Sequence, residues 1–127
     1  KVWGGISGVQ HTLPLLIAEC GVRSAELGSA LSLIARLTSF NVAERFNLPK
    51  TKGRIAVGAD ADLALVDLKA KFTVRAEDLL YRHKQSPYVG RALTGRVVRT
   101  ILRGNTVFHD GKLVSHPLGQ LVKPAVN

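Results

Sequence analysis

The apolar positions in the early part of this chain repeat at helical intervals. An unbroken apolar run after Thr12 predicts a short buried helix over residues 12–20, with the Thr12 hydroxyl as its N-cap. Further along, four apolar residues recur at spacings that place them on one face of a second helix. These four residues are Leu27, Leu31, Ile34 and Leu37. Asn41 followed by Glu44 has the spacing of a capping box and predicts a third short helix that runs through Phe46.

The later part of the chain carries short apolar runs of strand length, separated by glycine and aspartate. The run from Leu63 to Val66 predicts a buried strand, and the β-branched segment from Val97 to Leu102 predicts another. Gly104-Asn105 and Asp110-Gly111 have the composition of two-residue hairpin turns. Residues 96–114 are therefore expected to form a three-stranded meander.

The change from helical to strand-rich character places a domain boundary near residues 48–52. Pro49 falls at this point, and because the residue before a proline is disfavoured in a helix, the helical part is expected to end there. We therefore divide the chain into a helical part, residues 1–48, and a strand-rich part, residues 49–127. Within the second part, residues 76–81 are expected to form a helical turn.

The composition is that of an ordinary globular protein, with 46% hydrophobic and 21% charged residues. No apolar run approaches the ~20 residues of a membrane-spanning helix, so no membrane partner is expected. Cys20 is the only cysteine, which excludes an internal disulfide and fits a reducing, cytoplasmic setting. The sequence contains no Met, at its start or elsewhere, and it is expected to be a fragment of a longer chain.

The formal net charge of +9 favours a function of a different class, because a basic domain can bind nucleic acid by releasing counterions from the phosphates. Against this alternative, the 18 Lys and Arg residues are dispersed, and aromatic residues make up only 6% of the chain, which leaves few platforms for stacking on bases. No zinc-finger, RNA-recognition or helix-turn-helix pattern is visible. We therefore expect no nucleic-acid partner, and we keep a small basic nucleic-acid-binding module as the alternative.

Few residues have the spacing of a catalytic or metal-binding centre. The four histidines form no His-x-His or His-x-x-x-His pair, and Cys20 has no partner cysteine, so no metal site is expected within the chain. Asp60 and Asp62 could serve acid–base chemistry if a pocket separated their pKa values. Aspartate beside glycine also favours turns, and we expect a structural role for both. No residue of this chain is predicted to be catalytic.

Three separated segments resemble the cyclic-amide hydrolases of the amidohydrolase superfamily. The first, Trp3 to Gln10, reads Trp-Gly-Gly-Ile-Ser-Gly-Val-Gln, and the second, Lys52 to Asp67, has two glycine-spaced turns and Ala-Asp before a buried strand. The third, Tyr81 to Arg91, contains Ser-Pro-Tyr-Val-Gly. Hydantoinases, dihydropyrimidinases and allantoinases share these features. The Tyr-Arg-His-Lys run and the Trp-Gly-Gly start with Gln10 are most similar to allantoinases, whereas hydantoinases more often carry Glu at that position.

The resemblance implies a C-terminal fragment of a hydrolase that opens allantoin to allantoate, with a hydantoinase or dihydropyrimidinase as the near alternative. It implies an α+β fragment, in which residues 1–48 supply the last helices of a (β/α)₈ barrel. Residues 49–127 would supply the C-terminal half of a small β-sandwich built from both chain ends. The family's two metal ions, usually zinc, are bound by four histidines, a carboxylated lysine and an aspartate, all of which precede Lys1 in the family pattern. The fragment alone is therefore expected to be inactive.

The resemblance also implies a substrate-binding role for main-chain groups after the last metal ligand. Gly4 and Gly5 are the candidates, because the lack of a Cβ lets a ligand approach the backbone. The expected partners are allantoin or a related cyclic ureide and the remainder of the parent chain, and the family implies a tetramer. An exposed sheet edge is expected where the other sandwich strands would pair.

Overall fold

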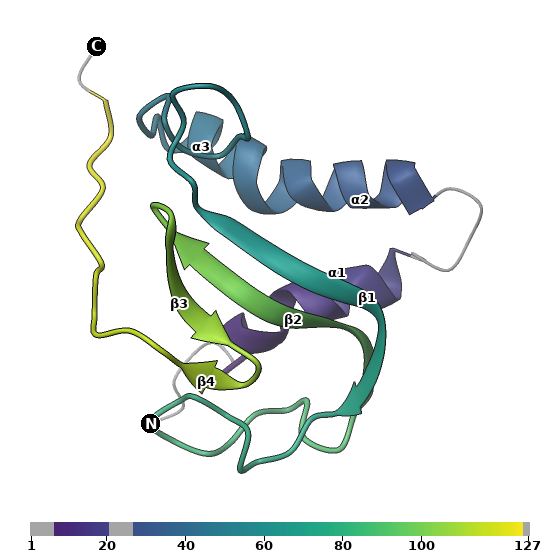
Figure 1. Ribbon diagram of the computed structural model, residues 1–127. Helices are drawn as coiled ribbons and strands as arrows, with labels where there is room; N and C mark the ends of the chain where they lie inside the picture. Colours follow the sequence, from purple (N-terminus) through teal and green to yellow (C-terminus); the bar gives the residue numbers. More distant parts are fainter. Residues whose placement is uncertain (1–6, 21–26, 126–127) are drawn as a thin grey trace, which may run out of the picture.

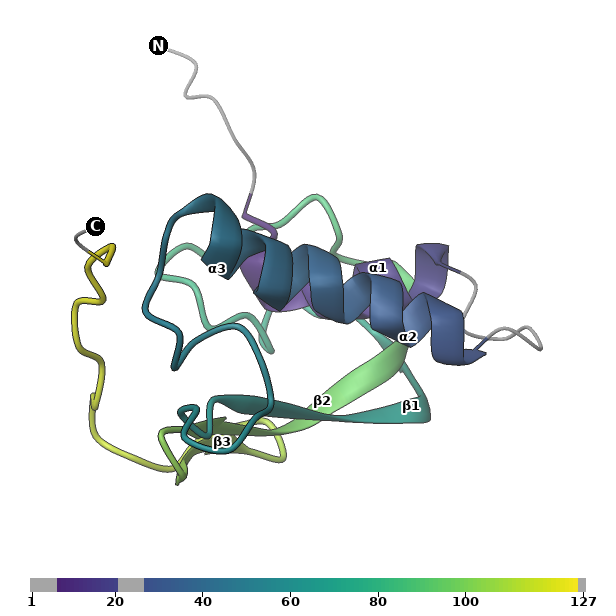
Figure 2. The ribbon, with the colours of Figure 1, turned by 90° about the horizontal axis from the view of Figure 1, so that it is seen from above.

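The computed structural model describes residues 7–20 and 27–125. Within them, the helices lie over one face of a single antiparallel sheet, as Figures 1 and 2 show from two directions. The helical elements are η1 (a 3-10 turn, Val9–His11), α1 (Thr12–Glu19), α2 (Leu27–Ala35), η2 (a π turn, Arg36–Phe40) and α3 (Asn41–Arg45). The strands are β1 (Leu63–Thr73), β2 (Ala92–Leu102), β3 (Asn105–His109) and β4 (Lys112–Leu113).

The predicted helix over residues 12–20 is confirmed as α1, but its start differs from the prediction. Because η1 leads directly into α1, Thr12 lies inside a continuous helical segment. Its hydroxyl donates to the Gly8 carbonyl oxygen at 3.3 Å and does not cap the helix. Pro14 is buried in the first turn of α1, where proline is tolerated.

The second and third predicted helices form one continuous helical segment, residues 27–45. The prediction that Asn41 opens a new helix is wrong, because the preceding Phe40 already has helical φ and ψ of −62° and −55°. Within the π turn η2, the Thr38 hydroxyl donates to the Ile34 carbonyl oxygen at 2.8 Å. Ile34 is 3% exposed, whereas Leu37 is 47% exposed. The predicted apolar face is therefore buried only in part.

The strands pair antiparallel in the order β1-β2-β3-β4. The predicted meander is confirmed as β2, β3 and β4. β1 adds a fourth strand, which extends well beyond the predicted run from Leu63 to Val66. β1 also forms an edge of the sheet, since no described strand pairs with its outer side.

One hairpin turn is confirmed and the other is displaced by one residue. Asp110 and Gly111 form the second turn, with φ values of 44° and 84°. The prediction of Gly104-Asn105 for the first turn is wrong: Arg103 and Gly104 form it, with φ values of 45° and 82°. Asn105 is already paired with Leu102 in the ladder. Positive φ at both central residues is what a type I′ turn requires.

A bulge bends β1 opposite Gly95. The register between β1 and β2 shifts between Asp67 and Lys71. Asp67 Oδ1 accepts hydrogen bonds from the N–H groups of Lys69 (2.9 Å) and Ala70 (3.1 Å), which stabilises the extra residues. Across from the bulge, Gly95 has a φ of +90°, a conformation that strongly favours glycine.

Gly95 also lets α1 approach the sheet. A Cβ at this position would lie 2.8 Å from Cγ2 and 3.0 Å from Cδ1 of Ile17, a residue of α1 that is only 3% exposed. The helix therefore packs directly on the backbone of β2.

A small core lies where the segment after β1 meets the sheet. Its central residues are Val74, Leu79 and Leu93, each at most 3% exposed. The partly buried residues that pack against them are Leu15, Phe72, Tyr81 and Tyr88. The helical turn predicted at residues 76–81 is confirmed only in part: the N–H groups of Asp78 and Leu79 donate to the carbonyls of Arg75 and Ala76 at 3.3 Å each, and the residues after Leu79 are irregular. Burial of Leu79 packs the end of this turn against the sheet.

The C-terminal segment returns to the helical part of the molecule. Asn47 and Ala125 exchange two hydrogen bonds, from the Ala125 N–H to the Asn47 carbonyl (2.7 Å) and from Asn47 Nδ2 to the Ala125 carbonyl (2.8 Å). Arg103 donates to the Leu118 carbonyl oxygen at 2.5 Å. The segment is thus held at two points, one on the β2–β3 hairpin and one after α3 (Figure 1).

The fold is α+β, as expected, with one antiparallel sheet. The division of the chain at residues 48–52 stays a prediction. Several large apolar side chains outside the core are exposed. They include Phe46, Ile55, Val57 and Leu121. None of the helices in the described ranges has the length and apolar content needed to span a bilayer.

Candidate functional site

The predicted substrate-binding residues, Gly4 and Gly5, lie outside the described residues. The description of this loop begins at Ser7, two residues after Gly5. Residues 7–11 connect the glycine pair to α1 along the sequence, and side chains of a distant loop hold them in place.

Both ends of this connecting segment are hydrogen-bonded to the loop between β1 and β2. The Ser86 hydroxyl donates to the Ser7 carbonyl oxygen at 2.7 Å. The backbone N–H of Gln10 donates to the Tyr81 hydroxyl oxygen at 2.7 Å. Sequence reasoning noted Tyr81 and Ser86 only as motif residues, and it did not place them beside residues 7–10.

The side chain of Gln10 also bonds to this loop, through both atoms of its amide. Its Nε2 donates to the Asp78 carbonyl oxygen at 2.9 Å, and its Oε1 accepts from the Leu80 N–H at 2.8 Å. Each bond goes to a main-chain group, so the contact depends on the path of the loop and not on the identity of its side chains.

His11, the next residue, is buried and stacked on the sheet. It is 4% exposed, and its ring lies 6.5 Å from that of Phe72, centroid to centroid, with an angle of 29° between the planes. Its Nδ1 has no hydrogen-bond partner among the described residues. Burial lowers the pKa of His11 below its ordinary value, because desolvation disfavours the charged ring.

Asp60 and Asp62 form an ion-paired cluster with Lys52. Lys52 Nζ lies 2.8 Å from Asp60 Oδ2 and 2.5 Å from Asp62 Oδ2. The hydrogen bonds to Asp60 and Asp62 raise the pKa of Lys52. For Asp62, desolvation acts to raise the pKa, but the bonds from Lys52 and from the Arg103 N–H (2.7 Å) outweigh it and leave the pKa lowered.

This cluster ties the turn before β1 to the β2–β3 hairpin. Asp62 reaches the backbone of Arg103, and the Gly104 N–H donates to the Ala61 carbonyl oxygen at 3.0 Å. Both carboxylates are thereby engaged in the fold. The geometry supports the structural interpretation of Asp60 and Asp62 over an acid–base one.

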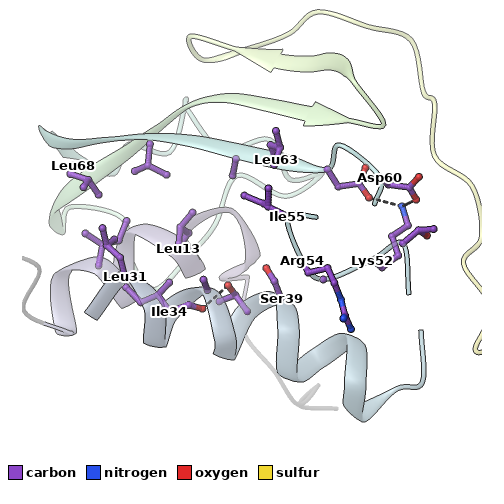
Figure 3. A pocket seen from close by; sticks show the side chains of 18 residues that line it. Leu13, Leu31, Ile34, Ser39, Lys52, Arg54, Ile55, Asp60, Leu63 and Leu68 are labelled. Atoms are coloured by element: carbon purple, nitrogen blue, oxygen red, sulfur yellow. Dashed lines mark hydrogen bonds and ion pairs between the residues drawn. The ribbon is translucent and has the colours of Figure 1, made fainter. Parts of the chain in front are cut away.

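A cavity of about 650 Å³ opens between α2 and the start of β1. In Figure 3, Leu13, Leu31 and Ile34 gather at its apolar end, and Lys52 and Asp60 lie at the opposite end. Since the acidic groups at that end are already paired with Lys52, the cavity offers packing surface rather than free reactive groups.

The described residues do not fit a metal centre. No group of three or more His, Cys, Asp and Glu side chains within residues 7–20 and 27–125 is placed to share an ion. His109 is the last residue of β3, next to Asp110 of the β3–β4 turn, with 3.6 Å between Nδ1 and Oδ2. Cys20 is a partly buried free thiol directly after α1. No step of a reaction is therefore assigned to a metal held by these residues.

Comparison of the sequence with known proteins gives matches over most of its length. The sequence profile of the amidohydrolase family matches residues 12–107. An allantoinase from Rubrobacter xylanophilus is 53% identical over 124 residues, which cover 98% of this chain and 26% of that protein. An allantoinase from Desulfitobacterium hafniense is 50% identical over 124 residues, 98% of this chain and 27% of that protein.

Comparison of the fold with solved structures leads to the same group of proteins. The L-hydantoinase (dihydropyrimidinase) from Arthrobacter aurescens superimposes with a TM-score of 0.83 at 30% identity, over 94% of this chain and 26% of that chain. A D-hydantoinase from a Thermus species superimposes with a TM-score of 0.78 at 27% identity. This chain thus spans about a quarter of the length of the curated relatives that it matches. The family profile, the sequence identities and the shared fold together establish that the chain belongs to the amidohydrolase family.

Proposed function

We propose that this chain is the C-terminal part of a larger metal-dependent cyclic amidohydrolase, specifically an allantoinase. The whole enzyme would open the hydantoin ring of allantoin by hydrolysis of a cyclic amide bond, giving allantoate. The observation that carries this proposal is the 53% identity to an allantoinase over 98% of the chain. The hydantoinase structures, at 30% and 27% identity, are more distant in sequence.

The proposed architecture is that residues 1–48 contribute the last helices of a (β/α)₈ barrel and residues 49–127 contribute half of a β-sandwich. The outer edge of β1, with which no strand of residues 7–20 and 27–125 pairs, and the exposed apolar side chains of Ile55 and Val57 support this proposal. Both features leave surface that a continuation of the sheet would cover. The matched allantoinases are about four times as long as this chain, so they contain further residues that could form such a continuation.

Within that enzyme, we assign Gly4 and Gly5 to the rim of the substrate site. Their main-chain groups would hydrogen-bond the ring amide, and no residue of this chain would take part in proton transfer. The two metal ions proposed for the whole enzyme, zinc by the family resemblance, would be held by residues outside this chain. We also propose that the whole enzyme is a homotetramer, as the family resemblance implies. A reducing, cytoplasmic setting is part of the proposal and is supported by the single cysteine of this chain.

A substrate panel tests the proposed activity. The complete protein, loaded with zinc, is assayed with allantoin, hydantoin and dihydrouracil. The proposal predicts the highest kcat/KM for allantoin. A preference for hydantoin or dihydrouracil would assign the protein to the hydantoinase or dihydropyrimidinase alternative. Salt-dependent binding of DNA without ring opening would favour the basic binding module.

A substitution tests the assignment of Gly5. Gly5→Val in the complete protein should raise KM or lower kcat with little change in bound zinc, because the added side chain blocks approach of the ring to the backbone. Gly119→Val is the matched control, since a Cβ at Gly119 meets nothing within 4 Å. Kinetics in Gly5→Val equal to those of the control would remove Gly5 from the substrate site.

A further inference from the structure

A second cavity, of about 580 Å³, opens between the helical turn η1 and the sheet. It is lined by residues of η1, of β2, of the β3–β4 hairpin, and of the end of β1 with the loop that follows. We propose that this cavity binds a small organic anion, in which a carboxylate or a phosphate group is attached to an apolar body. The site goes beyond the proposed function, because none of the residues assigned to the substrate takes part in it.

Three cationic side chains and one acidic side chain contribute to the lining. The cations are Lys71 of β1, Arg75 just after β1 and Arg96 of β2, and the acidic residue is Asp78. None of the three cations forms an ion pair with an acidic side chain of residues 7–20 and 27–125. The lining therefore carries an excess of positive charge, and low-dielectric walls focus such a charge on a bound anion.

The guanidinium of Arg96 lies beside the β3–β4 turn. A Cβ built at Gly111, which also lines the cavity, would lie 3.6 Å from Nη2 of Arg96. In the ladder, Arg96 is paired with Asp67. The Oδ1 atom of Asp67 accepts from the N–H groups of Lys69 and Ala70, so this carboxylate is already engaged by the bulge of β1. Arg96 is thereby left available to a ligand.

Aromatic and aliphatic side chains form the other walls, among them Phe72, Val97 and Phe108. His11 also lines the cavity, although it is only 4% exposed, and its ring is stacked on that of Phe72 at 6.5 Å between centroids. Its Nδ1 has no hydrogen-bond partner among the described residues, whereas buried polar atoms in folded proteins are almost always paired. An unpaired buried nitrogen in the lining of a cavity points to a ligand atom or an ordered water that completes the site.

The two kinds of wall select the two parts of the ligand. A guanidinium binds two oxygens of a carboxylate or a phosphate group through parallel N–H donors, and an ammonium group binds either as a point charge. Phe72 and Phe108 offer surface to an aromatic or aliphatic body. Benzoate and phenyl phosphate contain both parts and differ only in the head group, whereas benzamide has the same ring without a charge.

Calorimetric titration of the complete, zinc-loaded protein with these three molecules tests the site. We expect at least one of the two anions to bind, about tenfold or more tightly than benzamide, because only the anions satisfy the cationic side chains. The affinity of that anion should fall as sodium chloride is added. The tighter of the two anions identifies the head group as a carboxylate or a phosphate.

Substitutions of exposed cations locate the binding. Lys71→Gln and Arg96→Gln should each weaken the anion roughly three- to tenfold, the loss expected for one charged hydrogen bond partly open to water. Arg45→Gln is the matched control, since Arg45 belongs to α3 and does not line the cavity. All three side chains are exposed, so the unfolding temperatures of the variants should stay close to that of the wild type.

The site is supported if the two cavity variants weaken the anion and Arg45→Gln does not. It is overturned if neither anion binds, or if benzamide binds as tightly as the anions. Equal affinities in Lys71→Gln, Arg96→Gln and the wild type would place the anion elsewhere on the protein and would overturn it as well, as would an equal loss in Arg45→Gln. Hydrolysis of allantoin by the same protein is measured separately, and its absence would overturn the proposed function alone.

Discussion

Replacing Gly95 by alanine tests the packing of α1 on the sheet most sharply. Gly95 has a φ of +90°, and a Cβ there would lie 2.8 Å from Cγ2 of Ile17. The left-handed backbone alone costs an alanine about 1–2 kcal/mol. The contact with Ile17, which is nearly fully buried, adds about 1–3 kcal/mol of overpacking. Gly95→Ala should therefore lower the free energy of unfolding by about 2–5 kcal/mol.

Gly104→Ala separates the two contributions. Gly104 has a φ of +82°, close to that of Gly95, but a Cβ there meets nothing within 4 Å. It should cost only the backbone term of about 1–2 kcal/mol. Urea unfolding of the complete protein, followed by circular dichroism, measures both variants. A second substitution, Ile17→Ala, should relieve part of the cost in Gly95→Ala and none in Gly104→Ala. Equal losses for Gly95→Ala and Gly104→Ala would refute the close contact between α1 and β2.

Three further substitutions test other contacts of the structure. Gly53→Ala should destabilise the protein by about 1–3 kcal/mol more than Gly58→Ala. Both glycines have φ near +80°, but a Cβ at Gly53 would lie 2.5 Å from the Cβ of Ala43 and 3.0 Å from the carbonyl oxygen of Ser39, whereas a Cβ at Gly58 meets nothing within 4 Å. Equal unfolding midpoints for the two variants would contradict the close packing at Gly53. The lowered pKa of Asp62 contributes stability above its unfolded pKa of about 4 and loses it as the pH falls through the folded pKa. The difference in unfolding free energy between wild type and Asp62→Asn should therefore shrink from pH 6 to pH 3, and a constant difference would argue against the ion pair with Lys52. For His11, the lowered pKa means that the unfolded chain binds more protons as the pH drops below about 6.5, so stability falls there. His11→Phe should flatten this part of the pH profile, and an unchanged slope would place the proton uptake elsewhere.

The parts of the fold that local chemistry determines were predictable from the sequence. The Asp110-Gly111 turn was predicted because both residues readily adopt positive φ, and the structure has both at positive φ. The other hairpin was misplaced by one residue, because Gly104 was assigned to the first position of the turn. In the structure, Arg103 occupies the first turn position, with positive φ, and Gly104 occupies the second. The pairing of Leu102 with Asn105 in the flanking strands determines this placement of the turn.

The errors in the helical part have a tertiary cause. Asn41 has the composition of a helix start, but burial of Ile34 on one side and of Ala43 on the other keeps the chain helical through it. At residues 76–81, the predicted helical turn goes no further than Leu79, a residue that is buried against the sheet.

The surroundings of the candidate site could not be predicted in this way. Gln10 and Tyr81 are 71 residues apart, and Ser7 and Ser86 are 79 apart. Neither pair has a local signal, because a single sequence carries no information on which distant loop will lie beside which. The motifs around these residues indicated the family. Only the fold shows that they meet.

The most direct test is a comparison of allantoate formation by the complete protein and by the 127-residue chain alone, with the same zinc supplied to both. We expect ring opening by the complete protein and none by the 127-residue chain, whose described residues hold no cluster of metal ligands. Turnover of allantoin by the shorter chain, or intact allantoin after incubation with the zinc-loaded complete protein, would contradict the proposed role.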